Sequence, residues 1–146
     1  MKKIIKLLFL VSWLATIYYL SSQNGELSGD LSNSLLYKVG VFFNVSDPAN
    51  FVLQYESLFR KFAHFSEYCI LGFLLYLTLI EFVHHKTLLL TIVLCVIYAI
   101  SDEIHQLYVV GRVFAFVDIV IDSIGAYCGS SFIHLLYTEC FRGKKH

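Results

Sequence analysis

Four long apolar segments constrain this chain more than any other feature of its sequence. Each is about 20 residues long, the length that an α-helix needs to cross the hydrocarbon core of a bilayer. They run over about Ile4–Leu20, Arg60–Val83, Thr87–Leu107 and Val113–Tyr137. The sequence therefore predicts an all-α, polytopic membrane protein with a four-helix transmembrane bundle, and residues 1–146 are expected to form a single domain.

The composition excludes several other classes of protein. Hydrophobic residues make up 58% of the chain and charged residues 15%, against roughly 45–50% and about 25% in a typical soluble domain. The 11 basic residues are matched by 11 acidic ones, so no basic surface for nucleic acid is indicated. The four cysteines have no CxxC spacing and indicate neither a zinc site nor a disulfide framework.

The distribution of lysine and arginine predicts the orientation in the membrane, because these residues are enriched in cytoplasmic loops. Seven of them fall on one side and four on the other. The seven are Lys2, Lys3, Lys6, Lys86, Arg142, Lys144 and Lys145; the four are Lys38, Arg60, Lys61 and Arg112. We therefore expect both termini in the cytoplasm, and the connections Ser21–Phe59 and Tyr108–Arg112 on the outer face.

The connection Ser21–Phe59 is longer than an unstructured loop in a compact domain usually is. Apolar residues recur within it at helical spacing: Leu27, Leu31, Leu35, Leu36, Val39 and Phe42. This pattern predicts an amphipathic helix on the outer surface. Packing of the same segment against the outer end of the bundle is an equally good interpretation and is compatible with the first.

Ionisable and polar residues recur on three of the predicted helices at spacings that place them on common faces. They are Arg60, His64 and Glu67 on the second helix; Asp102, Glu103, His105 and Gln106 on the third; and Asp118 and Asp122 on the fourth. All lie toward the outer half of the bilayer, where buried charges are costly and are normally paired or face a cavity. The sequence therefore predicts one shared site, and Gly125 predicts a close helix approach beside it.

Several kinds of chemistry fit this set of residues. His64, Glu67, Asp102, Glu103, His105 and Asp118 are candidate acid/base or catalytic groups. Arg60, Lys61 and Arg112 can hold a phosphate or carboxylate, with Gln106 and Asp122 on the same faces. No nucleophile motif is present, although Ser21, Ser22 and Ser101 carry hydroxyl groups. A network that merely pins the helices together is the alternative for any one of these residues.

A divalent metal ion such as zinc or manganese is a further candidate. Its ligands would come from His64, Glu67, Asp102, His105 and Asp118. The spacing of these residues matches no established metal-binding motif.

Three separated stretches of the chain resemble VanZ-like membrane proteins. They are Ser21-Ser22-Gln23; Arg60-Lys61-Phe62-Ala63-His64-Phe65-Ser66-Glu67-Tyr68 followed by Leu71-Gly72; and Tyr98-Ala99-Ile100-Ser101-Asp102-Glu103-Ile104-His105-Gln106 followed by Gly111-Arg112, Asp118 and Gly125. Two positions depart from the family pattern: Val110 stands where a proline is frequent, and Asp122 where asparagine is common. The second departure adds a carboxylate beside Asp118.

The resemblance implies a bacterial cell membrane location and an association with glycopeptide resistance, especially to the lipidated glycopeptide teicoplanin. It also implies that Ser21, Ser22, Gln23 and Ser101 belong with the ligand-contacting residues. It implies no particular reaction.

Three functions are compatible with the sequence. The first is an outward-facing polar pocket that binds or processes an amphipathic ligand, such as a lipid-linked cell-wall precursor, a phospholipid headgroup or a lipoglycopeptide. The second is a non-enzymatic protein that sequesters the drug or shields the precursor. The third is a proton- or ion-coupled carrier, against which the absence of an inverted repeat argues.

Overall fold

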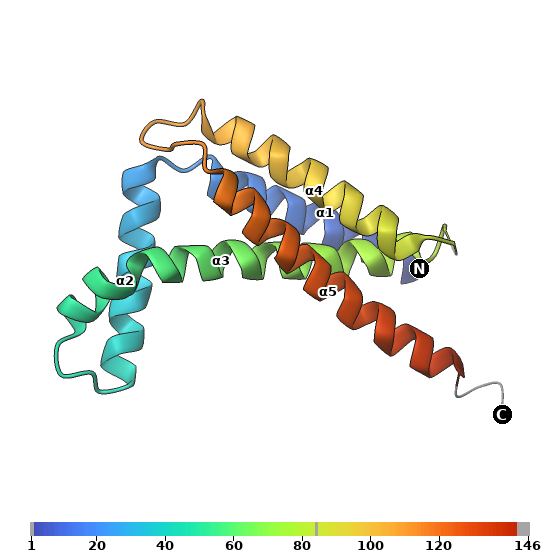
Figure 1. Cartoon of the computed structure of the whole chain (residues 1–146), viewed down its shortest axis with the longest axis horizontal. Coiled ribbons are helices and arrows are strands. Elements are labelled where there is room, and N and C mark those ends of the chain that lie inside the picture. Colours follow the sequence, from blue (N-terminus) through green and yellow to red (C-terminus); the bar gives the residue numbers. More distant parts are fainter. Residues whose placement is uncertain (1, 84, 143–146) are drawn as a thin grey trace.

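The computed structural model describes residues 2–83 and 85–142. Over these residues the chain forms five helices and no strand: α1 (Lys2–Ser21), α2 (Gly25–Phe42), α3 (Pro48–Leu79), α4 (Thr87–Gln106) and α5 (Phe116–Arg142) (Figure 1). Lys144 and Lys145, two of the seven basic residues expected on the cytoplasmic side, lie outside the described residues. The predicted all-α fold is confirmed.

Four of the helices, α1, α3, α4 and α5, are long and apolar enough to cross a membrane. Large apolar side chains on their outer surfaces are exposed, including Leu8, Ile97 and Phe132. Such a surface is unfavourable in water and favourable in lipid. The protein is therefore a multi-pass membrane protein whose helices contact lipid.

Helix α3 is the centre of the bundle, because it contacts each of the four other helices. It begins at Pro48, earlier than the segment Arg60–Val83 that hydropathy predicted, and it has 32 residues. Pro48 occupies the first turn, and the side chain of Asp47 accepts a hydrogen bond from the backbone N–H of Asn50 (3.1 Å), which are both strong helix-start features. At 1.5 Å per residue the helix is about 48 Å long, so its first turns extend beyond a hydrocarbon core of about 30 Å.

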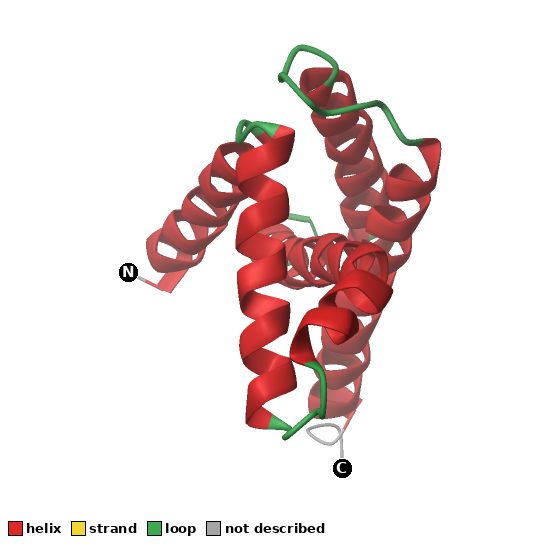
Figure 2. Ribbon diagram, turned by 90° about the vertical axis from the view of Figure 1, so that its left-hand side faces the viewer, coloured by secondary structure: helices red, strands yellow, loops and turns green. Residues whose placement is uncertain are grey.

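Helix α2 occupies the long connection and crosses the first half of α3 at a steep angle (Figure 1). Leu36 and Gly40 are its buried residues, and a Cβ atom at Gly40 would meet the ring of Phe51 on α3 at 3.2 Å. The apolar stripe that predicted this helix stays largely exposed, with Phe42 at 78%. In the view turned by 90°, α2 and the first turns of α3 lie in front of the other helices (Figure 2). It therefore packs on the end of the bundle and still presents an apolar face.

The tightest helix contact joins α3 to α5, where backbone meets backbone. A Cβ atom would lie 2.3 Å from the carbonyl oxygen of Phe65 at Gly125, and 1.9 Å from that of Cys69 at Gly129. No side chain fits at these positions, so the close approach predicted at Gly125 is confirmed. Asp122, one turn before Gly125, is thereby held against α3.

Two hydrogen bonds join the middle of α1 to α3 and α4. The indole Nε1 of Trp13 donates to the backbone carbonyl of Glu67 on α3 (3.0 Å), and the hydroxyl of Tyr98 on α4 donates to that of Leu14 (3.1 Å). We refer to the end of the bundle that holds the α1–α2 turn and the α4–α5 loop as the polar end. At the opposite end, Lys6 forms an ion pair with Glu81 (2.5 Å).

Candidate functional site at the polar end

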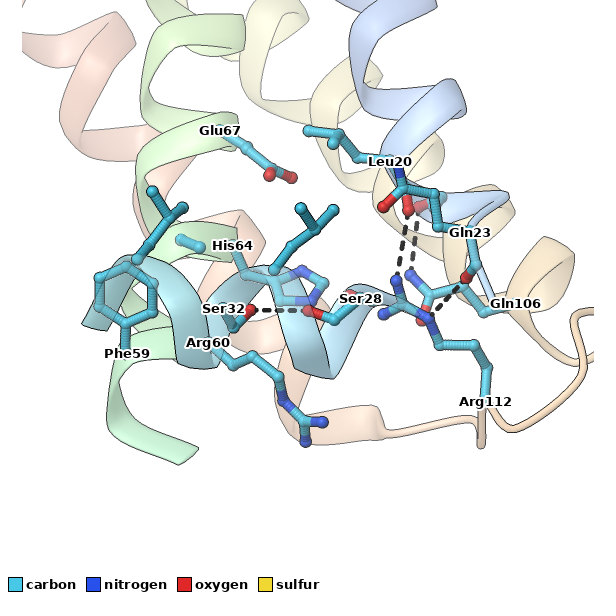
Figure 3. A pocket seen from close by; sticks show the side chains of 14 residues that line it. Leu20, Gln23, Ser28, Ser32, Phe59, Arg60, His64, Glu67, Gln106 and Arg112 are labelled. Atoms are coloured by element: carbon cyan, nitrogen blue, oxygen red, sulfur yellow. Dashed lines mark hydrogen bonds between the residues drawn. The ribbon is translucent and has the colours of Figure 1, made fainter. Parts of the chain in front are cut away.

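A cavity of about 280 Å³, the main pocket, lies at the polar end between α1, α2, α3 and the end of α4 (Figure 3). Its lining combines charged, polar and apolar side chains. They belong to Leu20, Ser21, Gln23, Ser28, Leu31, Ser32, Leu35, Phe59, Arg60, Ala63, His64, Glu67, Gln106 and Arg112. Arg60, His64 and Glu67, which helical spacing placed on one face of the second predicted helix, all line this pocket.

Two further cavities, of about 110 and 270 Å³, lie beside the main pocket. Arg60 and His64 line all three cavities. Asp118 at the start of α5 lines both side cavities, and Lys61 lines the larger of them. The cavities therefore form one polar region centred on Arg60 and His64.

Arg112 is held in place by the end of α1. Its Nε donates to the backbone carbonyl of Gln23 (3.3 Å), and its Nη2 donates to that of Leu20 (3.2 Å). Burial lowers the pKa of the Arg112 guanidinium, and the positive charge of Arg60 lowers that pKa further. Two guanidinium groups therefore lie near each other in one pocket, and one of them is fixed to the backbone.

The turn after α1 and the loop before α5 are joined by their backbones. The N–H of Gly25 donates to the carbonyl of Val110 (3.0 Å). Gly111 has a φ of +77°, a conformation that residues with a side chain rarely adopt. The Ser-Ser-Gln segment and the Gly-Arg segment, far apart in sequence, form one corner of the pocket through these contacts and those of Arg112.

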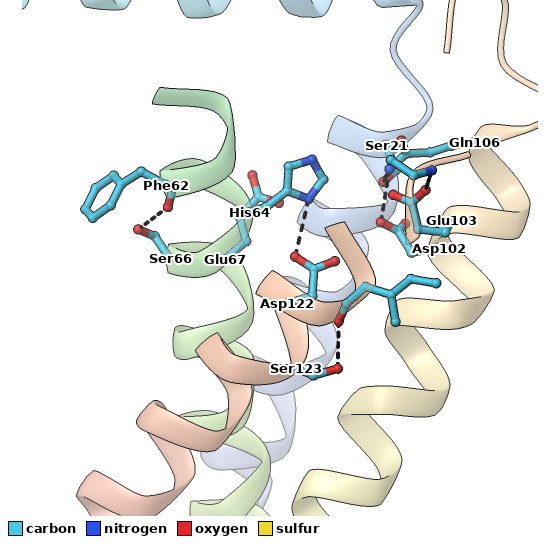
Figure 4. Close-up of polar contacts among 12 residues, drawn as sticks. Ser21, Phe62, His64, Ser66, Glu67, Asp102, Glu103, Gln106, Asp122 and Ser123 are labelled. Carbon is cyan, nitrogen blue, oxygen red and sulfur yellow. Dashed lines mark hydrogen bonds and ion pairs between the residues drawn. The ribbon is translucent and has the colours of Figure 1, made fainter. Parts of the chain in front are cut away.

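His64 and Asp122 face each other across the α3–α5 contact (Figure 4). Nδ1 of His64 lies 3.4 Å from Oδ1 of Asp122, and the Asp122 side chain is completely buried. Neither carboxylate oxygen of Asp122 has a hydrogen-bond partner within the described part of the chain. Asp122, which was expected to contact a ligand, thus contacts His64 and lines none of the cavities.

Three polar residues of α4, Asp102, Glu103 and Gln106, are buried and stabilise the bundle. Nε2 of Gln106 donates to Oγ of Ser21 (3.2 Å) and to Oδ2 of Asp102 (3.3 Å). Oε2 of Glu103 accepts a hydrogen bond from the backbone N–H of Ala115 (2.8 Å), which holds the α4–α5 loop. Asp102 and Glu103 are buried and line none of the three cavities.

Three further predicted site residues, Ser22, Ser101 and His105, also line none of the three cavities. Nε2 of His105 lies 3.1 Å from Oγ of Ser22, and the His105 ring packs on Tyr18 with the ring centroids 4.9 Å apart. Ser101 is exposed and donates to the carbonyl of Tyr98 (2.8 Å). The structure thus separates these three from Arg60 and His64.

The family of the chain is shown by comparison with known proteins. The VanZ/LLP1 family matches residues 6–137 and so includes every segment that forms the pocket. The chain belongs to the VanZ/LLP1 family. No curated protein and no solved structure matches the chain.

The metal candidates of this VanZ/LLP1 protein do not converge as a ligand set. Among the residues that the structure describes, no group of three or more His, Cys, Asp or Glu side chains is placed to hold a metal ion. His105 contacts Ser22 away from the pocket, and Asp102 accepts a hydrogen bond from Gln106. We therefore assign no metal to the pocket.

Sequence reasoning missed the contribution of α2 to the pocket. Ser28, Leu31, Ser32 and Leu35 of α2 all line the main pocket. The helical spacing of the leucines predicted the helix itself. It could not indicate that this helix lies beside Arg60, because the preceding turn determines its direction.

Proposed function

We propose that this VanZ/LLP1 membrane protein binds the anionic headgroup of an amphipathic ligand of the bacterial cell envelope. Ligands of this kind include a lipid-linked cell-wall precursor, an anionic phospholipid and a lipoglycopeptide of the teicoplanin type. Binding of the drug or of the precursor would connect the pocket to teicoplanin-type resistance.

The observation that carries this proposal is the presence of Arg60 and Arg112 in one pocket. The charge of Arg60 acts on Arg112, and an anion bound by both side chains would offset the repulsion between them. Arg60 has no hydrogen bond or ion pair with another described residue, and Arg112 keeps unused N–H groups beyond its two backbone contacts. Planar guanidinium groups are well suited to phosphate and carboxylate.

Among the side chains that line the cavities, the carboxylates are fewer than the cations. In the main pocket Glu67 is the single carboxylate beside Arg60 and Arg112. In each side cavity Asp118 is the single carboxylate beside two cations, Arg60 with either Arg112 or Lys61. Each cavity is therefore lined by more cationic than acidic side chains, whereas the carboxylates of Asp102, Glu103 and Asp122 are buried outside these linings.

The leucines that α2 contributes to the pocket suit the apolar part of such a ligand. Leu31 and Leu35 line the main pocket, and they are also 46% and 53% exposed on the outer surface of α2. An apolar stripe that runs from a pocket wall to the surface offers a hydrocarbon chain a continuous contact. The pocket thus has a charged side for a headgroup and an apolar side for a chain.

We further propose that the polar end faces the outside of the cell and that both termini are cytoplasmic. The lysines at the start of α1 and Lys86 before α4 lie at the opposite end of the bundle. Their excess there is typical of the cytoplasmic face. A pocket on the outer face would meet envelope ligands on the side where the cell wall is built.

Competition binding tests the proposal on the purified, detergent-solubilised protein. Native mass spectrometry would compare dioleoyl phosphatidic acid with dioleoyl phosphatidylcholine, which differ only in headgroup. We expect preferential binding of phosphatidic acid, weakened at least about tenfold by Arg60→Gln, because a charged hydrogen bond contributes about 1.5–3 kcal/mol. Lys86→Gln, which removes a positive charge at the opposite end, should leave the preference unchanged. Equal binding of both lipids, or an unaffected Arg60→Gln variant, would disprove the proposal.

A further inference from the structure

The contact between His64 and Asp122 orients a proton acceptor toward the pocket. Nδ1 of His64 is buried and faces Asp122 Oδ1 at 3.4 Å, whereas the ring also lines the three cavities at the polar end. Figure 4 shows the second ring nitrogen directed away from Asp122. When the ring is neutral, a carboxylate beside Nδ1 favours the tautomer with the proton on Nδ1 and leaves Nε2 unprotonated, which is the tautomer that a general base requires.

Helix pinning does not account for this arrangement. The backbones of α3 and α5 already meet at Gly125 and Gly129, so the interface needs no ion pair to hold it. A buried ion pair stabilises a fold weakly, because both groups lose their hydration. A completely buried carboxylate with a single imidazole partner at the edge of a cavity is instead typical of a histidine held for proton transfer.

The charges around His64 indicate which bond this base would act on. The guanidinium groups of Arg60 and Arg112 lie in the same pocket, and two guanidinium groups can hold the two phosphates of a diphosphate. Cleavage of a phosphoanhydride releases a phosphate that leaves without being protonated, so one base and two cations are enough. A phosphate monoester would also need an acid for its leaving alkoxide.

We propose that the main pocket hydrolyses the phosphoanhydride bond of a lipid diphosphate, with His64 as general base and Asp122 as the residue that positions it. This inference rests on the proposed function, because the same arginines bind the headgroup. It adds a reaction and a substrate class to a binding site.

The reaction consumes one water molecule. Nε2 of His64 takes a proton from the water while the water oxygen bonds to the terminal phosphorus. The bond from that phosphorus to the bridging oxygen breaks, and its electron pair stays with the bridging oxygen. The products are the lipid monophosphate and inorganic phosphate, and His64 returns its proton to water through the pocket. Arg60 and Arg112 offset the negative charge on the phosphate oxygens during the transfer.

Geranylgeranyl diphosphate in detergent micelles, with the full-length protein, provides the test. We expect the wild type to release inorganic phosphate and geranylgeranyl monophosphate, with oxygen from ¹⁸O-labelled water in the inorganic phosphate. His64→Gln should lower kcat about 100-fold or more and leave KM nearly unchanged, since the base acts in the transition state. Arg60→Gln should mainly raise KM.

Asp122 requires its own variants, because it is buried. Asp122→Asn should lower kcat at least about tenfold without raising KM, since an amide no longer selects the Nδ1-protonated tautomer. Asp122→Glu should recover part of kcat, which a purely structural role does not predict. His64→Gln, at the edge of the cavity, keeps the test valid if the Asp122 variants fail to fold.

The outcomes separate this inference from the proposed function. Wild-type protein that binds geranylgeranyl diphosphate through Arg60 but releases no phosphate would overturn the reaction and leave the binding proposal standing. Full kcat in His64→Gln would also overturn it. Failure of the wild type to bind either this lipid or phosphatidic acid would reject both.

Discussion

Nη2 of Arg112 donates to the backbone carbonyl of Leu20 over 3.2 Å, which joins the end of α1 to the loop before α5. Carbonyl groups at the end of a helix lack partners within the helix and carry partial negative charge. The Leu20 carbonyl also accepts a hydrogen bond from the backbone N–H of Gln23 (3.3 Å), and Arg112 adds a charged donor to it while lining the main pocket. The residue that closes the polar end of the bundle thus also contributes positive charge to the candidate site.

Loss of the Arg112 contacts should destabilise the protein. Arg112→Lys keeps the positive charge. The guanidinium donates hydrogen bonds to the carbonyls of both Leu20 and Gln23, and a single ammonium group cannot reproduce that geometry. We expect a loss of about 1–3 kcal/mol in the free energy of unfolding, measured by denaturant titration in detergent. Val113→Ala, at an 80% exposed position in the same loop, serves as the control. Equal stability of Arg112→Lys and the control would contradict this role.

The glycines of α5 should tolerate no side chain. Gly125→Ala and Gly129→Ala place a Cβ atom 2.3 Å and 1.9 Å from backbone carbonyl oxygens of α3, so the two helices must separate. We expect a loss of more than about 2 kcal/mol for each. Gly29→Ala in α2 meets no atom within 4 Å and should be neutral or stabilising by up to about 1 kcal/mol. Thermal unfolding of the three variants gives the comparison, and an equal effect at all three positions would be inconsistent with the α3–α5 contact.

The ion pair at the opposite end should make stability depend on pH. The hydrogen bond from Lys6 holds the pKa of the Glu81 carboxyl below its ordinary value of 4.5. Because the pKa of Glu81 is lower in the folded state, its ion pair stabilises the fold fully at pH values above the ordinary pKa. This stabilisation is lost as the pH falls through the folded-state pKa. The difference in melting temperature between wild type and Glu81→Gln should therefore shrink on acidification below 4.5. A difference that stays constant over that range would rule out the titration of Glu81 as its cause.

The proposed orientation predicts which loops can be labelled from outside the cell. In a cysteine-free background, Val110→Cys lies at an exposed position of the polar end, and Lys86→Cys at an exposed position of the opposite end. A membrane-impermeant maleimide should label Val110→Cys in intact cells and Lys86→Cys only after permeabilisation. The reverse pattern would place the pocket in the cytoplasm.

Much of the fold follows from residues that are close in sequence. Hydropathy located the spanning helices, and helical spacing placed Arg60, His64 and Glu67 on the face that lines the pocket. The polar residues Asn50, Gln54 and Glu56 concealed the first part of α3, although the Asp47-Pro48 start signal was present. Hydropathy registers the preference for lipid, whereas α3 also extends beyond the length that a bilayer requires.

The site itself depended on tertiary contacts that spacing cannot supply. His105 shares a face of α4 with Asp102 and Gln106, yet its ring turns to Ser22 and Tyr18. Asp122 could be placed on the correct face of α5, but its partner is determined by how closely Gly125 allows α5 to approach α3. Side-chain periodicity gives a direction around one helix, and the neighbour in that direction depends on the packing of the whole bundle.

The most direct test of the central proposal is the proximity of a lipid phosphate to the two guanidinium groups of the pocket. Arg142→Lys leaves Arg60 and Arg112 as the two arginines of the chain, so ¹³C-guanidino labelling reports on these residues alone. Solid-state ¹³C–³¹P recoupling in bilayers with phosphatidic acid should show phosphorus close to both labels. Adding Arg60→Lys removes one label and should leave a single, weaker ³¹P effect at Arg112. Absence of ³¹P dephasing at either guanidinium, with the protein folded and the lipid in excess, would contradict the account.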